Sequence, residues 1–520
     1  MCKKLHLKKK IVLWAIVFFA CFTAFAQTPY NPYNVVMNIY NDPKTTMAFN
    51  WLTGAGVTGG KVQVMLGANI VKEAPALYTS HSGYTDNKVV VTGLSPGTTY
   101  SFRVGGVSGY WSSIGTFTTA KANKDPFSFI YVTDTQISGG SGSFNTLKTN
   151  TDAIAAKYPN AGFWLHCGDL TWDGGSTLVW NDYFTSQQAM FYKFPFAPIM
   201  GNHDIGGSNF KRHFNIEDFG TTDTLKSTYT YIYGDAQFFA INGEQNNNSS
   251  YITALSNWMR AKINAHPDIT WRIVYFHKNI YTGNGGGVQV EYGCKRWFEA
   301  MTPLFDTLNI DIALQGHSHI YEVIGPVYNR DTVPGSVSNV QSVPVHSTKN
   351  LKGKLGGIFN VREGTLYFTN GIFGNIYTNP SSLNNIPWPA HAPYNGKFAD
   401  ILPDYKDLFT GRLAGTGNSI AGNSTYSHVS VSTDSIVITT YVIDNGNSQL
   451  LDEITIVKCI DQVISNVTYN APNTTTTIKD CGVILNNVKV KNGAKLIIDA
   501  DRTTINSGFE VELGSEFEIK

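Results

Sequence analysis

Five short apolar runs in the middle of the chain each stop at a polar residue. Each run consists mostly of apolar, β-branched or aromatic residues, which is typical of a strand buried on both faces of a sheet. The runs are FSFIYVTD (127–134), AGFWLHCGD (161–169), FAPIMGNHD (196–204), ITWRIVYFH (269–277) and IDIALQGHSH (310–319). Between the third and fourth runs, AQFFAIN (236–242) predicts a strand, and residues 252–265 predict a helix because apolar side chains recur there at helical spacing. Strands that alternate with helices predict a layered α/β domain with mixed sheets, which we place at residues 125–458.

Residues 28–120 follow a different pattern, in which short β-rich stretches alternate with turns. The stretches are NVVMNIY, TTMAFNWLT, KVQVMLG, NKVVVTGL, TTYSFRVGG and GTFTTA. Evenly spaced strands of this kind predict an all-β sandwich. The passage from Leu94 to Tyr100, which contains Pro96 and Gly97, resembles a segment of a fibronectin type III domain. We expect this domain to pack against the α/β domain and brace it.

The last segment, residues 459–520, carries a short repeat. The stretch VKNGAKLII (490–498) recurs as VELGSEFEI (511–519), 21 residues later. Short β rungs stacked on one another would produce such a period. The segment resembles the C-terminal modules of secreted Gram-negative proteins, so we expect a sorting or spacer role and no catalysis.

The residues that end the five apolar runs share one kind of chemistry. In open α/β sheets, residues that close separate strands meet outside the carboxyl ends of the strands. Carboxylate, amide and imidazole donors without thiolates suit Zn, Fe, Mn and similar ions. Two such ions side by side clamp a phosphoryl group and convert bound water into hydroxide. The strand-end residues therefore predict phosphoester hydrolysis, and they are Asp134, Asp169, Asn202, His203, His277, His317 and His319.

In their order along the chain, the motifs resemble those of the calcineurin-like metallophosphoesterases and, within them, the purple acid phosphatases. The motifs are Asp-x-Gln (134–136), Gly-Asp-Leu (168–170), Gly-Asn-His-Asp (201–204), His277 and Gly-His-Ser-His (316–319). The resemblance spans residues 28–458 and implies two metal ions. It assigns the first ion to Asp134, Asp169 and His319, and the second to Asp169, Asn202, His277 and His317. It also implies that His203 stabilises the transition state or protonates the leaving oxygen, while Asp204 orients the His203 imidazole.

Two positions depart from the family pattern. Purple acid phosphatases carry a ligating tyrosine three residues after the bridging aspartate, but this chain has Trp172 there. An indole cannot replace a phenolate ligand, so we predict that the iron-loaded protein has no purple chromophore. Other branches of the family have Asp-x-His where this chain has Gln136, which leaves two roles open for that side chain: a weak metal ligand or a hydrogen-bonding neighbour of the ligands.

The resemblance implies a binuclear phosphatase that cleaves small phosphomonoesters by attack of metal-bound hydroxide. A phosphodiesterase or nucleotide hydrolase on the same metals is an alternative, because pocket shape decides between them. A surface glycan-binding protein with a degenerate catalytic domain is another. No basic patch or motif indicates nucleic-acid binding, and the sequence makes no prediction of oligomeric state.

The first 26 residues have the pattern of a signal peptide. Five lysines precede the apolar run IVLWAIVFFACFTAF, and Ala24-Phe25-Ala26 resembles a cleavage site. We expect cleavage to leave no membrane span and a protein exported to the periplasm or surface of a Gram-negative bacterium. A membrane anchor and a lipidated Cys21 are the alternatives. In such an oxidising compartment the spacing of Cys459 and Cys481 also permits a disulfide.

Overall fold

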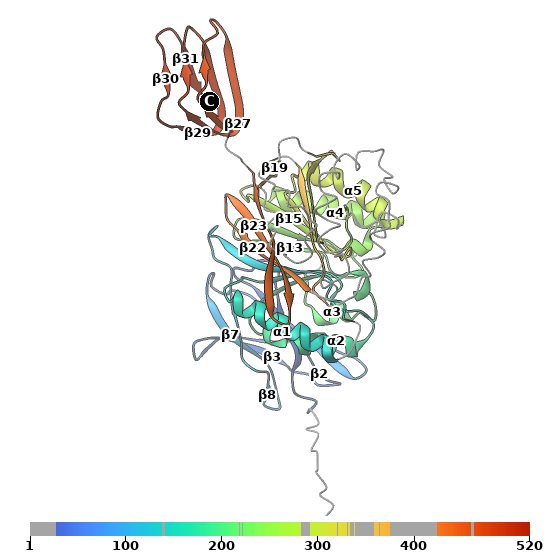
Figure 1. Cartoon of the computed structure of the whole chain (residues 1–520). Helices are drawn as coiled ribbons and strands as arrows, with labels where there is room; N and C mark the ends of the chain where they lie inside the picture. The colour runs from blue at the N-terminus through green and yellow to red at the C-terminus, as the bar shows by residue number, and fades with distance from the viewer. Residues whose placement is uncertain are drawn as a thin grey trace, which may run out of the picture.

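The computed structural model shows a strand-rich molecule with a protruding C-terminal module (Figure 1). It describes residues 28–137, 141–217, 219–220, 222–281, 292–319, 321–329, 331–332, 337–338, 358–362, 364–374, 424–458 and 462–520. The predicted signal segment and Cys459 of the predicted disulfide lie outside these ranges. Among the helices within these ranges, none is long and apolar enough to cross a membrane.

Two mixed sheets packed face to face form the central domain, and the five apolar runs are divided between them. The larger sheet has the order β19-β20-β24-β23-β22-β10-β11-β12 before it continues into the N-terminal domain, and the smaller has the order β13-β14-β15-β16-β21-β17-β18. The strands of the first are β19 (Val337–Ser338), β20 (Ile358–Asn360), β24 (Asn447–Val457), β23 (Ser435–Asp444), β22 (Ser424–Val431), β10 (Phe127–Val132), β11 (Trp164–Cys167) and β12 (Phe196–Ile199). Those of the second are β13 (Tyr229–Tyr233), β14 (Ala236–Ala240), β15 (Trp271–Phe276), β16 (Ile312–Gln315), β21 (Thr365–Asn370), β17 (Tyr321–Tyr328) and β18 (Asp331–Thr332).

Helices cover the outer faces of both sheets, which makes four layers. Buried side chains of α1 (Ser141–Lys157) and α2 (Thr177–Phe191) pack with those of β10 to β12. Those of α4 (Ser249–Asn264) and α5 (Tyr292–Leu308) pack with β14 to β16. A third apolar core lies between the two sheets and contains residues of both. The predicted α/β fold class with mixed sheets is therefore confirmed.

Helix α4 shows how the sequence produces one of these elements. Its buried residues Tyr251, Leu255, Met259 and Ile263 recur every four positions, so they form one apolar face. The side chain of Asn248 accepts a hydrogen bond from the backbone N–H of Tyr251 at 3.1 Å and caps the first turn. The helix predicted at 252–265 is confirmed and begins one turn earlier.

The N-terminal domain is the predicted β-sandwich, and its core is separate from those of the central domain. One sheet holds β1 (Tyr33–Asn38), β2 (Met47–Gly54), β6 (Tyr84–Val91) and β5 (Leu77–Ser80); the other holds β4 (Asn69–Pro75), β3 (Lys61–Leu66), β7 (Thr99–Val107), β8 (Tyr110–Trp111) and β9 (Gly115–Thr118). The first sheet joins the larger central sheet, because Asn38 of β1 pairs with Phe196 of β12. The side-chain amide of Gln188 on α2 also bonds to both backbone groups of Val35. The expected brace is thus a continuous sheet.

The C-terminal module is a stack of parallel β rungs. Its strands are β25 (Gln462–Ser465), β26 (Thr468–Tyr469), β27 (Thr475–Asn486), β28 (Lys489–Val490), β29 (Lys495–Ile505), β30 (Glu510–Val511) and β31 (Glu516–Ile519). Leu496 pairs in register with Phe517, which stands 21 residues later, as the repeat predicts. Leu485, Val490, Leu496 and Ile498 lie in the module's own apolar core.

The remaining short helices stand in loops: η1 (Asn202–Asp204), α3 (Asn209–His213) and η2 (Gly243–Gln245). The first two follow β12, and η2 follows β14. All three lie downstream of a strand's carboxyl end.

Candidate metal centre

The side chains that end the five predicted strands meet at one place. The parallel strands β10, β11 and β12 of the larger sheet, and β15 and β16 of the smaller sheet, direct their carboxyl ends toward it. Two groups of ligand atoms form there, Asp169 with His277 and His317, and Asp134 with Asp169 and His319. Within each group, the ligand atoms lie within 4.8 Å of one another.

Asp169 lies at the centre of the cluster and is fully buried. One of its carboxylate oxygens accepts a hydrogen bond from the backbone N–H of His203 at 2.8 Å. The other lies 3.2 Å from Nε2 of His277. Asp169 belongs to both ligand groups, so its position suits a carboxylate that bridges two ions.

Asp134 connects the end of β10 with the loop after β16. Its oxygens accept the backbone N–H of His317 at 2.9 and 3.1 Å, and Nε2 of His319 lies 3.2 Å from Oδ1. Burial would raise the pKa of Asp134, but His277 and His319 beside it lower that pKa to about 2. The carboxylate is therefore charged.

His277 offers one ring nitrogen to the cluster. Its Nδ1 lies 2.9 Å from the carbonyl oxygen of Cys167, which can only accept, so Nδ1 carries a proton. Nε2 then faces the other candidate ligand atoms: Oδ1 of Asn202 at 3.1 Å and Nδ1 of His317 at 3.2 Å. Burial would lower the pKa of His277, whereas Asp169 and Asp134 raise it to about 10.

Two observations indicate that the residues of this cluster are arranged to bind a metal ion. Five of the residues have left-handed backbone, a conformation that costs non-glycine residues energy and that persists at functional sites; they are Asp134, Gln136, Asp169, His317 and His319. Three candidate ligand atoms also surround Nε2 of His277, which carries at most one proton: Oδ2 of Asp169, Oδ1 of Asn202 and Nδ1 of His317, at 3.1 to 3.2 Å. A cation placed among these atoms would be the common partner that they share.

The glycines of the motifs are required by close approach. A Cβ at Gly201 would lie 2.2 Å from Oδ1 of Asp169. At Gly168, where φ is +89°, it would lie 2.7 Å from the ring of His277. Any side chain at either position would displace a ligand candidate, which explains why glycine precedes Asp169 and Asn202.

Gln136 lies against the cluster and donates to it. Its Nε2 is 2.5 Å from Oδ2 of Asp169, a hydrogen bond that fixes the carboxylate. Its Oε1 is buried and has no hydrogen-bond partner among the described residues. Of the two roles left open by the sequence, this geometry favours the hydrogen-bonding neighbour.

His203 and Trp172 stand together on the exposed side of the cluster. Nδ1 of His203 donates to the carbonyl oxygen of Trp172 at 2.9 Å, and the two ring centroids are 4.9 Å apart. The Trp172 side chain is 43% exposed, so it is a surface residue beside His203. With Nδ1 held in this way, Nε2 is the other ring nitrogen that could take part in chemistry.

The role predicted for Asp204 is wrong. Its buried carboxylate does not contact the His203 imidazole; it accepts hydrogen bonds from the backbone N–H groups of Leu170, Thr171 and Gly201 at 2.9 to 3.1 Å. Burial raises the pKa of Asp204 to about 7, although these amides act in the opposite direction. Asp204 therefore ties together the loops after β11 and β12, and the carbonyl of Trp172 orients His203 instead.

Sequence reasoning missed a buried carboxylate next to the cluster, that of Glu244 in η2. The pKa of Glu244 is raised, because the effect of burial exceeds the opposite effect of the nearby His277 charge. Nζ of Lys278, which directly follows His277, lies 3.5 Å from Oε2 of Glu244. The only signal in the sequence was that Glu244 stands just past the predicted strand 236–242.

Comparisons with known families agree with this arrangement. Residues 127–321 match the calcineurin-like phosphoesterase family, and residues 32–119 match the purple acid phosphatase N-terminal domain. The resemblance drawn from the motifs is therefore confirmed.

Similar proteins include both bacterial and plant chains. An uncharacterised protein of Mycobacterium tuberculosis is 25% identical over 328 residues, which cover 54% of this chain and 60% of that one. A probable inactive purple acid phosphatase of Arabidopsis thaliana is 22% identical over 280 residues, or 50% of this chain and 41% of that one. This chain thus spans 60% or less of the length of these two relatives.

Two solved structures share the fold. A purple acid phosphatase from yellow lupin (Lupinus luteus) seeds superposes with a TM-score of 0.61 at 15% identity and covers 83% of this chain and 75% of its own. The structure of PhoD superposes with a TM-score of 0.51 at 10% identity, covering 82% and 92%.

Proposed function

We propose that this chain, in which a calcineurin-like phosphoesterase domain follows a purple acid phosphatase N-terminal domain, is a metal-dependent phosphatase of small phosphomonoesters. The observation that carries the proposal is the pair of ligand groups that share the buried carboxylate of Asp169. Asp134, Asp169 and His319 would hold one ion, and Asp169, Asn202, His277 and His317 would hold the other.

The protein's own residues would prepare the site in three ways. When bound, the ions would supply Lewis acidity toward the phosphoryl oxygens and toward water. Gln136 and the backbone N–H of His203 hold the carboxylate of Asp169 in one orientation. His203, oriented by the carbonyl of Trp172 through Nδ1–H, would act through Nε2, which donates to a phosphoryl oxygen or to the leaving oxygen when the ring is doubly protonated.

Cleavage of phosphodiesters or nucleotide derivatives on the same centre is the enzymatic alternative. The exposed Trp172 supports this alternative, because an indole beside His203 gives a flat apolar surface for a base or another ring of the leaving group. Trp172 in place of the family tyrosine also leads us to expect a colourless iron-loaded protein.

A binding protein with a degenerate catalytic domain is the alternative from another class. It is supported by the Arabidopsis thaliana relative that is named as probably inactive, and by the loss of the tyrosine at Trp172. Against it, both aspartates, the asparagine and all the motif histidines are present, and their donor atoms converge.

We also propose that the protein is exported to the periplasm or cell surface. The lysine-rich start, the apolar run and Ala24-Phe25-Ala26 support export. Mass spectrometry of the mature protein should find an N-terminus at Gln27; an intact Met1 would contradict export through cleavage.

The test is hydrolysis of a chromogenic phosphomonoester and the matching diester after chelation and separate reloading with Zn, Mn, Fe or Mg. We expect chelation to abolish turnover and at least one metal to restore it, with the monoester cleaved faster. Asp169→Asn should reduce turnover by at least about 10³-fold, because the shared ligand loses its charge. Asp173→Asn, an exposed carboxylate four residues along the same loop, is the matched control and should keep wild-type turnover. Folded, metal-loaded protein without turnover on either ester would favour the binding-protein alternative.

A further inference from the structure

A second cavity, which we call the cationic cleft, lies between the N-terminal sandwich and the segment that follows the Gly-Asn-His-Asp motif. Its volume is about 500 Å³, a size typical of small-molecule sites. Strands β5 and β6 and the turn between them form one wall, and α3 with its flanking residues forms the other. It is lined by Thr79, His81, Asp86, Lys88, Ser208, Lys211, Arg212, Phe214, Ile216 and Lys226. None of these residues belongs to the candidate metal centre.

The charges in the cleft are strongly unbalanced. Four of its described lining residues are lysine or arginine, whereas Asp86 is the single carboxylate among them. Asp86 is 4% exposed and already paired, because Nε2 of His81 lies 2.5 Å from its Oδ1. The whole chain has a formal charge of only +1, so this excess is a local feature.

Two of the cations are fixed in place by neutral acceptors. Lys88 donates from Nζ to the carbonyl oxygens of Lys211 and Phe214. Nη1 of Arg212 donates to the hydroxyl of Tyr84 at 2.9 Å. These bonds immobilise the two side chains but do not compensate their charge.

Three of the four cations are not in contact with a carboxylate that the structure describes. Within the described ranges, neither Lys88, Lys211 nor Arg212 forms an ion pair with a carboxylate. Burial lowers the pKa of Lys88; Asp86 opposes this effect and Lys211 adds to it. Lys88 and Arg212 are half-buried and Lys211 is exposed at the rim, so an anion in the cleft could contact all three.

We propose that the cationic cleft binds a phosphate-type oxyanion. A tetrahedral oxyanion offers several acceptors to ammonium and guanidinium donors that converge, and such charge-assisted bonds are strong and geometrically specific. The donors line one cavity instead of forming a stripe across a surface, which suits a small ligand. The ligand is either free phosphate or a phosphate group of a larger organic molecule.

The cleft has a short connection to the candidate catalytic histidine. The side chain of Asn209 contacts Arg212 at 3.5 Å through Oδ1 and donates from Nδ2 to the carbonyl oxygen of Gly174 at 2.8 Å. The N–H of Gly174 in turn donates to the carbonyl oxygen of His203 at 2.7 Å.

The binding proposed here does not depend on metals or on turnover.

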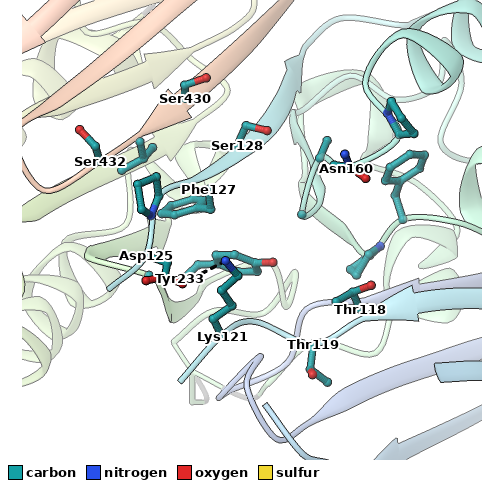
Figure 2. Close-up of a pocket in the computed structure, with 18 of the residues that line it drawn as sticks. Thr118, Thr119, Lys121, Asp125, Phe127, Ser128, Asn160, Tyr233, Ser430 and Ser432 are labelled. Carbon is teal, nitrogen blue, oxygen red and sulfur yellow. Dashed lines mark hydrogen bonds and ion pairs between the residues drawn. The ribbon is translucent and has the colours of Figure 1, made fainter. Parts of the chain in front are cut away.

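A larger cavity at the amino ends of β10 and β11 provides a comparison. Its volume is about 710 Å³, and Figure 2 shows that hydroxyl and amide groups line much of it. Its Lys121 is paired with Asp125 at 3.0 Å, unlike Lys88, Lys211 and Arg212 among the described residues of the cleft. Lys193 also lines this cavity and is exposed, so it serves as a matched control.

The experiment is titration of chelated, metal-free protein with inorganic phosphate and, separately, with glycerol phosphate, by calorimetry at constant ionic strength. We expect one phosphate site per chain in wild type and in Lys193→Gln. Lys211→Gln should bind about tenfold more weakly, since its loss removes one charge-assisted contact. Lys211 forms no side-chain hydrogen bond within the described ranges, so this variant should fold normally, and Lys211→Arg should restore binding.

The arms separate the two ligand sources and the ways in which the proposal fails. Equal binding of both ligands indicates recognition of the phosphate group alone, and tighter binding of glycerol phosphate indicates an organic ligand. The proposal is overturned if phosphate does not bind the metal-free protein or if Lys211→Gln binds phosphate as tightly as wild type does. It is also overturned if added chloride displaces phosphate as well as added sulfate does at equal ionic strength.

Discussion

At the scale of single residues, the motifs identified the ligand candidates but not their neighbours. Asp134, Asp169 and the motif histidines could be recognised because each closes an apolar run, and the sheets bring such positions together. The partner of His203 could not be recognised. It is the backbone carbonyl of Trp172, and a carbonyl leaves no mark in a sequence.

Asp204 provides a prediction that separates a structural role from a catalytic one. Asp204→Asn replaces one acceptor oxygen with an NH₂ group, which cannot accept a hydrogen bond from the backbone N–H groups that face it. This change should lower the free energy of unfolding by about 1–3 kcal/mol. Urea denaturation followed by fluorescence measures this. The folded variant should keep turnover within a few-fold of wild type; unchanged stability combined with a large loss of turnover would restore the orienting role.

At the scale of elements, the sequence predicted strands better than helices. The strands around the metal centre are continuous apolar runs, whereas β4 and β5 expose nearly all their side chains and show no such pattern. Helix α1 contains several threonine and asparagine residues, which have low helix propensity, so packing against the larger sheet holds it.

Helix α3 carries a histidine that should make stability depend on pH. His213 is buried with its ring stacked on Trp180 and Phe184, and burial lowers its pKa to about 4. The unfolded chain takes up this proton near pH 6.5, so the stability is present above that pH and is lost as pH falls toward 4. The loss is on the order of 3 kcal/mol if the full shift is realised.

Thermal or urea unfolding between pH 7.5 and 4 measures this dependence. His213→Gln should flatten the acid side of the stability profile relative to wild type. His266→Gln, at an exposed position, is the control and should leave the profile unchanged. A wild-type slope in His213→Gln would show that other groups carry the dependence.

At the scale of the whole molecule, the domains differ in how they are attached. The sequence indicated three modules after the signal segment, but it could not show that one sheet runs through two of them. That continuity rests on pairing between β1 and β12, residues far apart in the chain. The division of the five strand ends between two sheets was also invisible, because it depends on long-range packing.

Two deletions should therefore behave differently. A chain that ends at Lys458 should keep the unfolding midpoint and turnover of the full protein, since the C-terminal module has its own core. A chain without residues 28–120 should be insoluble or melt far earlier, because β12 would become an exposed edge and the contacts of Val35 with Gln188 would be lost. Calorimetry and the phosphatase assay compare them; equal behaviour of the two deletions would contradict this view of the interfaces.

The most direct test of the central claim is the number of metal ions bound per chain, measured by elemental mass spectrometry on the same samples used for phosphomonoester hydrolysis. Two ion sites that share Asp169 predict that turnover reaches its plateau at two ions per chain, and that Asp169→Asn binds fewer ions and is inactive. Full turnover with one ion or none, or two firmly bound ions without hydrolysis of any phosphoester, would contradict the proposal of a binuclear phosphatase.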